Sequence, residues 1–250
     1  MKINKVILSS DDNATYLDFW PIVSKIWRLK FNIEPILLYF GDNLSNVSPE
    51  YGKIIKCDID NTKPISIQVL WARYFFPSLD PEATYLISDI DMLPLSKYFF
   101  IDKIKDVHED KYVHLNPCIE TYGLIPSCYH VAKGKNYKKI LELPDTWRES
   151  LDQVVNSGLG RNVNGNPLWF ADEEYATNKI LKNKNIDQIV YLPREGGQNG
   201  RRIDRLDWTY YKDLISKEYY FDCHSLRPYS QYKKEIDDVI HSIVIHNNFM

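Results

Sequence analysis

The chain has 250 residues, of which 44 % are hydrophobic and 14 % aromatic, enough apolar material for one folded domain with a sizeable core. Its 31 lysines and arginines against 34 aspartates and glutamates give a formal net charge of -3, which argues against a protein that binds nucleic acid through bulk electrostatics. We therefore expect no nucleic-acid partner, and any basic patch must be local.

Cysteine spacing and hydropathy indicate the compartment. The cysteines are scattered, without the close pairs of zinc ribbons or redox motifs: Cys57, Cys118, Cys128 and Cys223. No apolar run approaches the roughly 20 residues of a membrane span, and the first residues do not form an apolar signal segment. We expect a reduced, cytoplasmic protein without a transmembrane segment. The sequence does not indicate the oligomeric state.

The first half alternates strand-like and helix-like segments. Short apolar runs predict strands at 6–8, 36–40, 53–57 and 85–88, and helical periodicity predicts helices at 16–30 and 65–76. Residues 9–13, rich in Ser, Asp and Asn, predict a polar turn after the first strand. This alternation favours an α/β fold, a mostly parallel sheet with helices on both faces.

The second half has a looser pattern. Strands are predicted at 111–115, 124–132 and 189–192, helices at 137–143, 149–156, 172–182 and 229–244, and loops at 158–167 and 194–205. No Ser/Pro-rich linker or visible repeat divides the chain. We therefore expect a single domain over residues 1–250, in which about 1–115 bind a common ligand and about 116–250 shape specificity.

Asp89 and Asp91 are the most informative residues. They follow the predicted strand 85–88, at a point where the chain must turn. Residues i and i+2 of an extended chain project together, so both carboxylates can approach one cation. Mg²⁺ and Mn²⁺ accept such oxygen ligands and commonly fill their remaining positions with substrate phosphates. The pattern predicts a divalent-cation site and a phosphate-containing substrate.

A second acidic triplet, Asp58-Ile59-Asp60, also follows an apolar run. Short acidic triplets are common, so at least one of the two is partly a decoy. We favour Asp89 and Asp91 because two strand-helix units precede them. Asp58 and Asp60 lead directly into Asn61-Thr62-Lys63-Pro64, which reads as a loop and a helix start.

Residues 9–11 and 88–91 should both lie at the carboxyl ends of parallel strands, where open α/β sheets bind ligands. At this point the chain resembles the GT-A glycosyltransferases, which transfer sugar from a nucleotide diphosphate donor through a metal held by a DxD motif. The resemblance rests on four segments: the opening 6–12, the helix with Arg73, Tyr-Leu-Ile-Ser-Asp-Ile-Asp-Met-Leu-Pro at 85–94, and Asp-Cys-His-Ser-Leu-Arg-Pro at 222–228. The chain is most similar to compact single-domain enzymes of bacterial surface-polysaccharide and large-virus systems.

The resemblance implies a GT-A fold and a metal-dependent glycosyltransferase using Mn²⁺ or Mg²⁺. The donor would be a nucleotide-sugar, with UDP-sugar favoured, and the acceptor a hydroxyl of a glycan or another molecule. It also implies roles for individual residues. The donor would contact Ser9, Ser10, Asp11, Arg73, Ser88, Asp89 and Arg227, the metal would bind Asp89, Asp91 and His224, and catalysis would use Asp172 and Glu173.

The donor residues have simpler structural alternatives. Residues 9–11 can form a polar turn, with Asp11, Asp12 or Asn13 capping the next helix. Arg73 can be a surface arginine that extends from an amphipathic helix. Arg227 can pair with Asp222 instead of meeting a diphosphate.

The late metal ligand has two candidates. His224 lies in a predicted strand-to-helix connection that can aim at the crevice, and a neutral imidazole suits Mn²⁺ better than Mg²⁺. His246 competes for the role but lies close to the last residue, so we favour His224.

The acidic segment Asp172-Glu173-Glu174 stands at the start of a predicted helix, where the helix dipole and free N–H groups favour an ionised carboxylate. The hypothesis is that Asp172 acts as the general base and accepts a proton from an acceptor hydroxyl, with Glu173 as the second choice. The alternatives are an ordinary acidic first turn, or a retaining mechanism that needs no such base.

The arginines of the predicted loop 194–205 suit two roles. They surround Gly196, Gly197 and Gly200, and such a loop can either fold over a diphosphate or remain solvated: Arg194, Arg201, Arg202 and Arg205.

Two other function classes compete with glycosyl transfer. A phosphohydrolase of the haloacid dehalogenase type also uses Asp-x-Asp after a strand, but normally after the first strand and followed by a small residue and Thr or Val. Here the pair follows roughly the fourth strand and leads into Met92-Leu93-Pro94. The other alternative is a nucleotide-sugar binding module without turnover.

Overall fold

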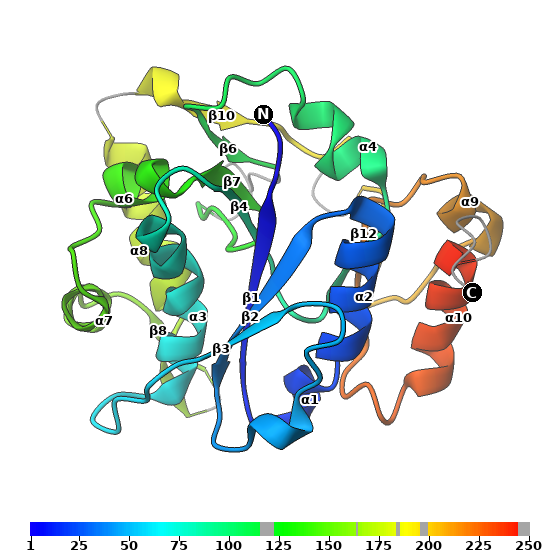
Figure 1. Cartoon of the computed structure of the whole chain (residues 1–250), viewed down its shortest axis with the longest axis horizontal. Coiled ribbons are helices and arrows are strands. Elements are labelled where there is room, and N and C mark those ends of the chain that lie inside the picture. Colours follow the sequence, from blue (N-terminus) through cyan, green and yellow to red (C-terminus); the bar gives the residue numbers. More distant parts are fainter. Residues whose placement is uncertain (116–122, 164, 184–185, 196–199, 245–250) are drawn as a thin grey trace.

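The centre of the protein is a seven-stranded mixed sheet (Figure 1). The computed structural model describes residues 1–115, 123–163, 165–183, 186–195 and 200–244. In spatial order the strands are β10 (Ile189–Tyr191), β6 (Tyr112–His114), β7 (His130–Lys133), β4 (Thr84–Ile87), β1 (Lys5–Asp11), β2 (Glu34–Phe40) and β3 (Lys53–Lys56).

Most neighbouring strands of this sheet are parallel. β4, β1, β2 and β3 all run in one direction, and β10 is parallel to β6. β7 is antiparallel to both of its neighbours, β4 and β6. The carboxyl ends of β1 and β4 therefore lie side by side at one edge of the sheet, the position at which such sheets bind ligands.

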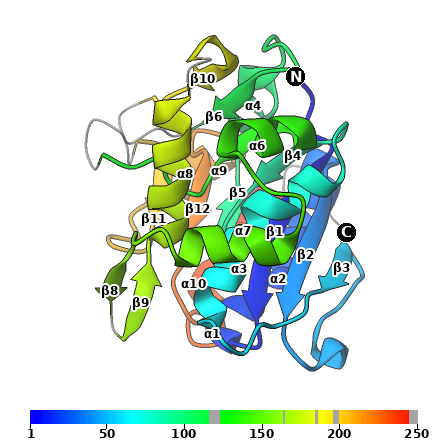
Figure 2. The same cartoon turned by 90° about the vertical axis from the view of Figure 1, so that its left-hand side faces the viewer.

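Alternating side chains of β1 divide the core into two layers. Val6 and Leu8 pack with α2 (Trp20–Phe31), α4 (Lys97–Phe100) and α10 (Lys233–Val244), whereas Ile7 faces the opposite layer. That layer contains α3 (Ile65–Phe75), α6 (Gly134–Leu141), α7 (Trp147–Val155) and α8 (Ala171–Lys182). In Figure 2, α3, α6 and α7 lie in front of the sheet. Helices thus cover both faces.

Two smaller sheets complete the architecture. β5 (Met92–Pro94) pairs with β12 (Asp222–His224), which also pairs with β11 (Arg202–Asp204). The register of β12 places His224 opposite Met92 of β5 and opposite Asp204 of β11. The second sheet is the hairpin of β8 (Arg161–Val163) and β9 (Asn166–Trp169). The remaining short helices are α1 (Ala14–Leu17) and α9 (Lys212–Ser216).

Several predicted boundaries were wrong. Residues 9–11 are not a turn but the end of β1, because their backbone pairs with residues 38–40 of β2. The predicted helix 16–30 is two helices, and the second begins just before Pro21. The predicted loops 158–167 and 194–205 contain the β8–β9 hairpin and β11, and the predicted strand 124–132 is reduced to β7. Gly196 and Gly197 lie outside the described residues.

None of the helices in the described ranges is both long enough and apolar enough to span a bilayer.

Candidate active site

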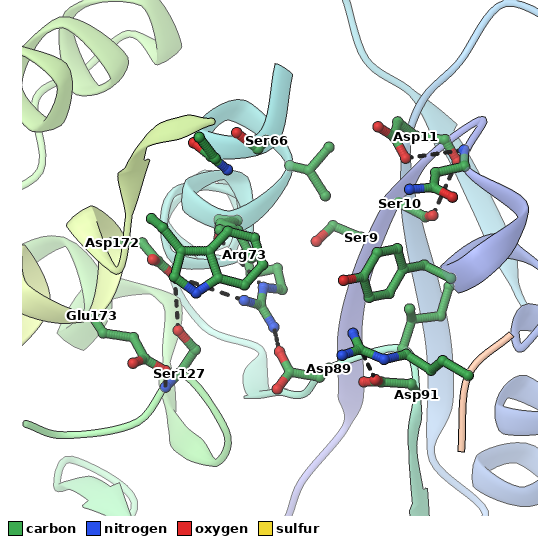
Figure 3. Close-up of a pocket in the computed structure, with 18 of the residues that line it drawn as sticks. Ser9, Ser10, Asp11, Ser66, Arg73, Asp89, Asp91, Ser127, Asp172 and Glu173 are labelled. Atoms are coloured by element: carbon green, nitrogen blue, oxygen red, sulfur yellow. Dashed lines mark hydrogen bonds and ion pairs between the residues drawn. The ribbon is translucent and has the colours of Figure 1, made fainter. Parts of the chain in front are cut away.

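A cavity of about 410 Å³ opens at the carboxyl ends of β1 and β4 (Figure 3). Ser9, Ser10 and Asp11 form one wall, and the start of α8, with Asp172 and Glu173, lies across from it. Asp89 and Asp91 line the cavity between these walls. Arg73 of α3 also lines it, although its side chain is buried. The cavity therefore collects residues from both halves of the chain.

Arg73 is a buried cation between two acids. Its side chain is 2 % exposed, forms an ion pair with Asp89, and lies 3.8 Å from Oδ2 of Asp172 (Figure 3). Its Nη1 also donates to the carbonyl oxygen of Ser88 at 3.1 Å. Burial lowers the pKa of Arg73, but the charges of the two acids raise it above its usual range. The alternative of a surface arginine is therefore wrong, and Arg73 is a permanent positive charge beside the cavity.

Ser127 holds both members of the acidic pair on α8. Its Oγ donates to Oδ2 of Asp172 at 2.8 Å, and its backbone N–H donates to Oε1 of Glu173 at 2.9 Å. The hydroxyl of Tyr74 donates a hydrogen bond to Oγ of Ser127 at 3.1 Å. This arrangement fixes two carboxylates at the edge of the cavity.

The pKa values of Asp172 and Glu173 differ from the sequence expectation. Burial raises the pKa of Asp172, although Arg73 and Ser127 oppose the shift. Burial, followed by the charge of Asp172, raises the pKa of Glu173 to about 8. The helix N-terminus was expected to favour the ionised form, but desolvation outweighs it here. Glu173 thus becomes a group that exchanges a proton near neutral pH.

Asp91 lies beside two arginines and a histidine. Its Oδ2 lies 2.9 Å from Nη1 of Arg205, 3.4 Å from Nη1 of Arg227 and 3.9 Å from Nε2 of His224. Nδ1 of His224 lies 3.4 Å from Oδ2 of Asp204, a geometry that orients the imidazole with Nε2 toward Asp91. Burial opposes ionisation of Asp89, but Arg73 holds the pKa of that carboxyl below its ordinary value. Asp89 is therefore available as an anion beside Arg73.

The donor set suits a hard divalent cation. Among the described residues no three Asp, Glu, His or Cys side chains are gathered closely enough to hold an ion alone. Asp91 and His224 face each other across 3.9 Å, a span that a cation with ligand distances of about 2.0–2.2 Å can bridge. Asp89 lines the same cavity. These residues fit Mn²⁺ or Mg²⁺ provided that ligand oxygens complete the coordination.

Solved structures that are similar to this chain include glycosyltransferases. The apo form of GlyE from Streptococcus pneumoniae TIGR4 aligns over 100 % of this chain and 63 % of its own, with a TM-score of 0.56 and 14 % identity. The galactosyltransferase LgtC, solved with donor and acceptor sugar analogs, aligns over 95 % of both chains, with a TM-score of 0.53 and 11 % identity. The chain has the GT-A fold. It spans 63 % of the length of GlyE, and its sequence matches no family model and no curated protein.

The GT-A cavity brings together most of the predicted donor residues. Ser9, Ser10, Asp11 and Arg227 all line it, and Arg227 pairs with Asp91 and not with Asp222. Ser88 is fully buried and does not line the cavity. Its carbonyl oxygen accepts a hydrogen bond from Nη1 of Arg73. The alternative capping role belongs to Asn13, whose side chain accepts from the N–H of Thr15 at 3.0 Å.

The second acidic triplet lies outside this GT-A cavity. Oδ2 of Asp60 pairs with Lys63 at 2.7 Å, and its Oδ1 accepts from the backbone N–H of Thr62 at 2.9 Å. Neither Asp58 nor Asp60 lines the cavity. Asp60 therefore has local partners that stabilise the loop before α3.

The late ligand candidates are placed differently from expectation. His224 is the last residue of β12, not part of a turn, and the strand register brings it to Asp91. His246 lies outside the described residues.

The sequence interpretation missed part of the site. In the sequence, Arg205 was one of four arginines of a predicted loop. In the structure, Arg194 and Arg202 pair with the buried carboxylate of Asp222, whereas Arg205 pairs with Asp91 in the cavity. Asp204 and Ser127 had no local signal, because their partners are distant in sequence. The remaining cavity residues from the hairpin are aromatic or amide side chains: Asn166, Trp169 and Phe170.

Proposed function

We propose that this protein is a metal-dependent glycosyltransferase that moves a sugar from a nucleotide diphosphate donor, preferably a UDP-sugar, to a hydroxyl of a glycan or another acceptor. One observation carries the proposal. One cavity is lined by two acidic pairs, Asp89 with Asp91 and Asp172 with Glu173, and the first pair offers carboxylates that would accept a cation. The GT-A fold and the likeness to GlyE and LgtC support the same reaction class.

The donor would lie along the carboxyl ends of β1 and β4. Ser9, Ser10 and Asp11 offer hydroxyl, carboxylate and backbone groups to the nucleoside. Asp89, Asp91 and His224 would hold Mn²⁺ or Mg²⁺, which when bound neutralises charge on the diphosphate leaving group. Arg227, beside Asp91, adds positive charge on the same side.

The acceptor would approach the second acidic pair. Its hydroxyl oxygen forms a bond to the anomeric carbon while the bond from that carbon to the diphosphate oxygen breaks, and the hydroxyl proton passes to a carboxylate. Both acids line the cavity, accept a hydrogen bond from Ser127 and have a raised pKa, but Asp172 also faces Arg73. We therefore assign proton acceptance to Glu173, and to Asp172 the task of holding Arg73 and Ser127 in place.

The competing functions predict different behaviour. A phosphohydrolase of the haloacid dehalogenase type would have its Asp-x-Asp after the first strand of another fold, whereas here the pair follows β4 of a GT-A fold. A binding module without turnover would bind donor but release no nucleotide in the presence of any acceptor.

A thermal-shift panel of nucleotide-sugars, each with Mn²⁺ or with EDTA, tests the proposal. We expect UDP-sugars to raise the melting temperature much more with Mn²⁺ than with EDTA. Release of UDP over time, followed in the same preparation, then separates turnover from binding. Stabilisation by no nucleotide-sugar, or rapid hydrolysis of a generic phosphatase substrate, would contradict the proposed function.

A further inference from the structure

Asp91 presents one oxygen to two guanidinium groups and an imidazole. Arg205, Arg227 and His224 all approach Oδ2, and the guanidinium of Arg205 makes the shortest contact, 2.9 Å. The side chain of Asp91 is 6 % exposed, so water has little access to this carboxylate. The position that a cation would use on this oxygen is thus occupied by an arginine of the same chain.

A divalent cation and Arg205 cannot use this oxygen in the same way at the same time. Both carry positive charge, and their mutual repulsion is strong in a site with little access to water. A cation binding alone to the free protein must displace Arg205 and leave its charge without a partner. Both penalties lower the affinity for the free cation.

A nucleoside diphosphate removes both penalties. Its phosphate oxygens supply additional ligands for the cation, and they also accept hydrogen bonds from a displaced guanidinium. The side chain of Arg205 is 25 % exposed and lines the cavity, so it has room to turn. Its neighbour Arg202 remains bound to buried Asp222, which anchors the backbone of β11 during that movement.

Arg205 is better suited to this exchange than Arg227. The guanidinium of Arg227 lies farther from Asp91, at 3.4 Å, and also rests over the ring of Tyr16, 4.8 Å from its centre. Arg205 follows the last residue of β11 and precedes Leu206, whose side chain is 88 % exposed. The turn therefore lies at the surface, where a side chain moves with little repacking.

We propose that Arg205 keeps the cation position on Asp91 closed in the free protein and transfers its guanidinium to the donor diphosphate when nucleotide and cation bind together. This inference rests on the proposed function, because it assumes a nucleoside diphosphate in the cavity. In this exchange Arg205 couples cation binding to donor binding, so that the two ligands bind together as a complex.

Calorimetric titrations of Mn²⁺ alone, and of UDP in saturating Mn²⁺, test the exchange in wild type and Arg205→Gln. Without nucleotide, Arg205→Gln should bind Mn²⁺ about tenfold more tightly than wild type, because a competing charge is gone. With Mn²⁺ present, the same variant should bind UDP about tenfold more weakly, because a phosphate partner is gone. Arg205→Lys keeps the charge and should stay close to wild type in the first titration.

The control is Arg148→Gln, on the exposed surface of α7, which should change neither titration. Unchanged Mn²⁺ affinity in Arg205→Gln, with Mn²⁺-dependent UDP binding intact in wild type, would overturn the exchange and leave the proposed function standing. Absence of Mn²⁺-dependent UDP binding in wild type would overturn the proposed function and this inference with it.

Discussion

Arg73 is a buried cation whose removal would leave carboxylates without a counter-charge. We predict that Arg73→Gln lowers the free energy of unfolding by about 3 kcal/mol, the usual cost of breaking a buried pair. Adding Asp172→Asn to that variant should restore part of the loss, because the buried carboxylate is then also neutral. Urea denaturation of the two single variants and the double variant measures this coupling. Strictly additive losses would contradict an interaction between Arg73 and Asp172.

Glu173 makes stability depend on pH. Its pKa, raised by burial and by Asp172, is about 8 in the folded protein against an ordinary value of 4.5. The folded protein therefore favours the protonated form of the Glu173 carboxyl. Its contribution to stability is complete below about pH 4.5 and is lost as the pH rises through about 8. We predict that Glu173→Gln gains stability relative to wild type between pH 5 and pH 8.5.

Unfolding titrations at several pH values measure that gain. Glu82→Gln, at the surface, serves as the comparison and should run parallel to wild type. A constant difference between wild type and Glu173→Gln across this range would show that Glu173 ionises normally.

Residue identities were predictable where the signal is local. Asp89 and Asp91 stand out because a short strand delivers two carboxylates to a turn, and the structure places both in the cavity. The contacts of His224 with Asp91 and Asp204 depend on the pairing of β5, β12 and β11. No spacing in the sequence encodes that register, so Asp204 and the distinct position of Arg205 were not predicted.

At the scale of elements, α6 begins against the backbone of the turn after α3. A Cβ at Gly134 would clash with the backbone carbonyl oxygens of Pro77 and Asp80. Backbone atoms cannot yield as a flexible side chain can, so we predict that Gly134→Ala lowers the free energy of unfolding by about 3 kcal/mol. Chemical denaturation measures the change.

Gly158 offers a matched control in the approach to the β8–β9 hairpin. Its φ of +73° disfavours other residues, but nothing lies within 4 Å of a Cβ there. Gly158→Ala should therefore cost only about 1 kcal/mol. An equal or larger loss than for Gly134→Ala would mean that the close approach at α6 relaxes easily.

Elements with strong periodicity were predicted well, and those fixed by distant partners were not. The helix 65–76 and the strand 36–40 correspond closely to α3 and β2 because their apolar pattern is continuous. Residues 9–11 have a turn-like composition, yet the ladder with β2 holds them extended. Most of the hairpin 161–169 was predicted to be a loop because glycine and asparagine dominate residues 158–167.

In the whole molecule, the alternating pattern correctly predicted an α/β protein with a mostly parallel sheet, and the resemblance correctly predicted the GT-A fold. The position of β7, antiparallel between β4 and β6, could not be predicted, because strand order depends on long-range pairing. This strand joins the two halves of the chain in one sheet. The division into a donor half and an acceptor half stays a prediction.

The proposed function requires this cavity to bind a nucleoside diphosphate through a cation on Asp91. The most direct measurement is the dissociation constant of UDP, with Mn²⁺ and with EDTA, for wild type, Asp91→Asn and Asp60→Asn. We predict that Mn²⁺ tightens UDP binding by about 100-fold in wild type and Asp60→Asn, and has almost no effect in Asp91→Asn, which lacks the charge that holds a hard cation. Equal affinity of wild type in EDTA, or loss of the Mn²⁺ effect in Asp60→Asn with Asp91→Asn unaffected, would contradict the account.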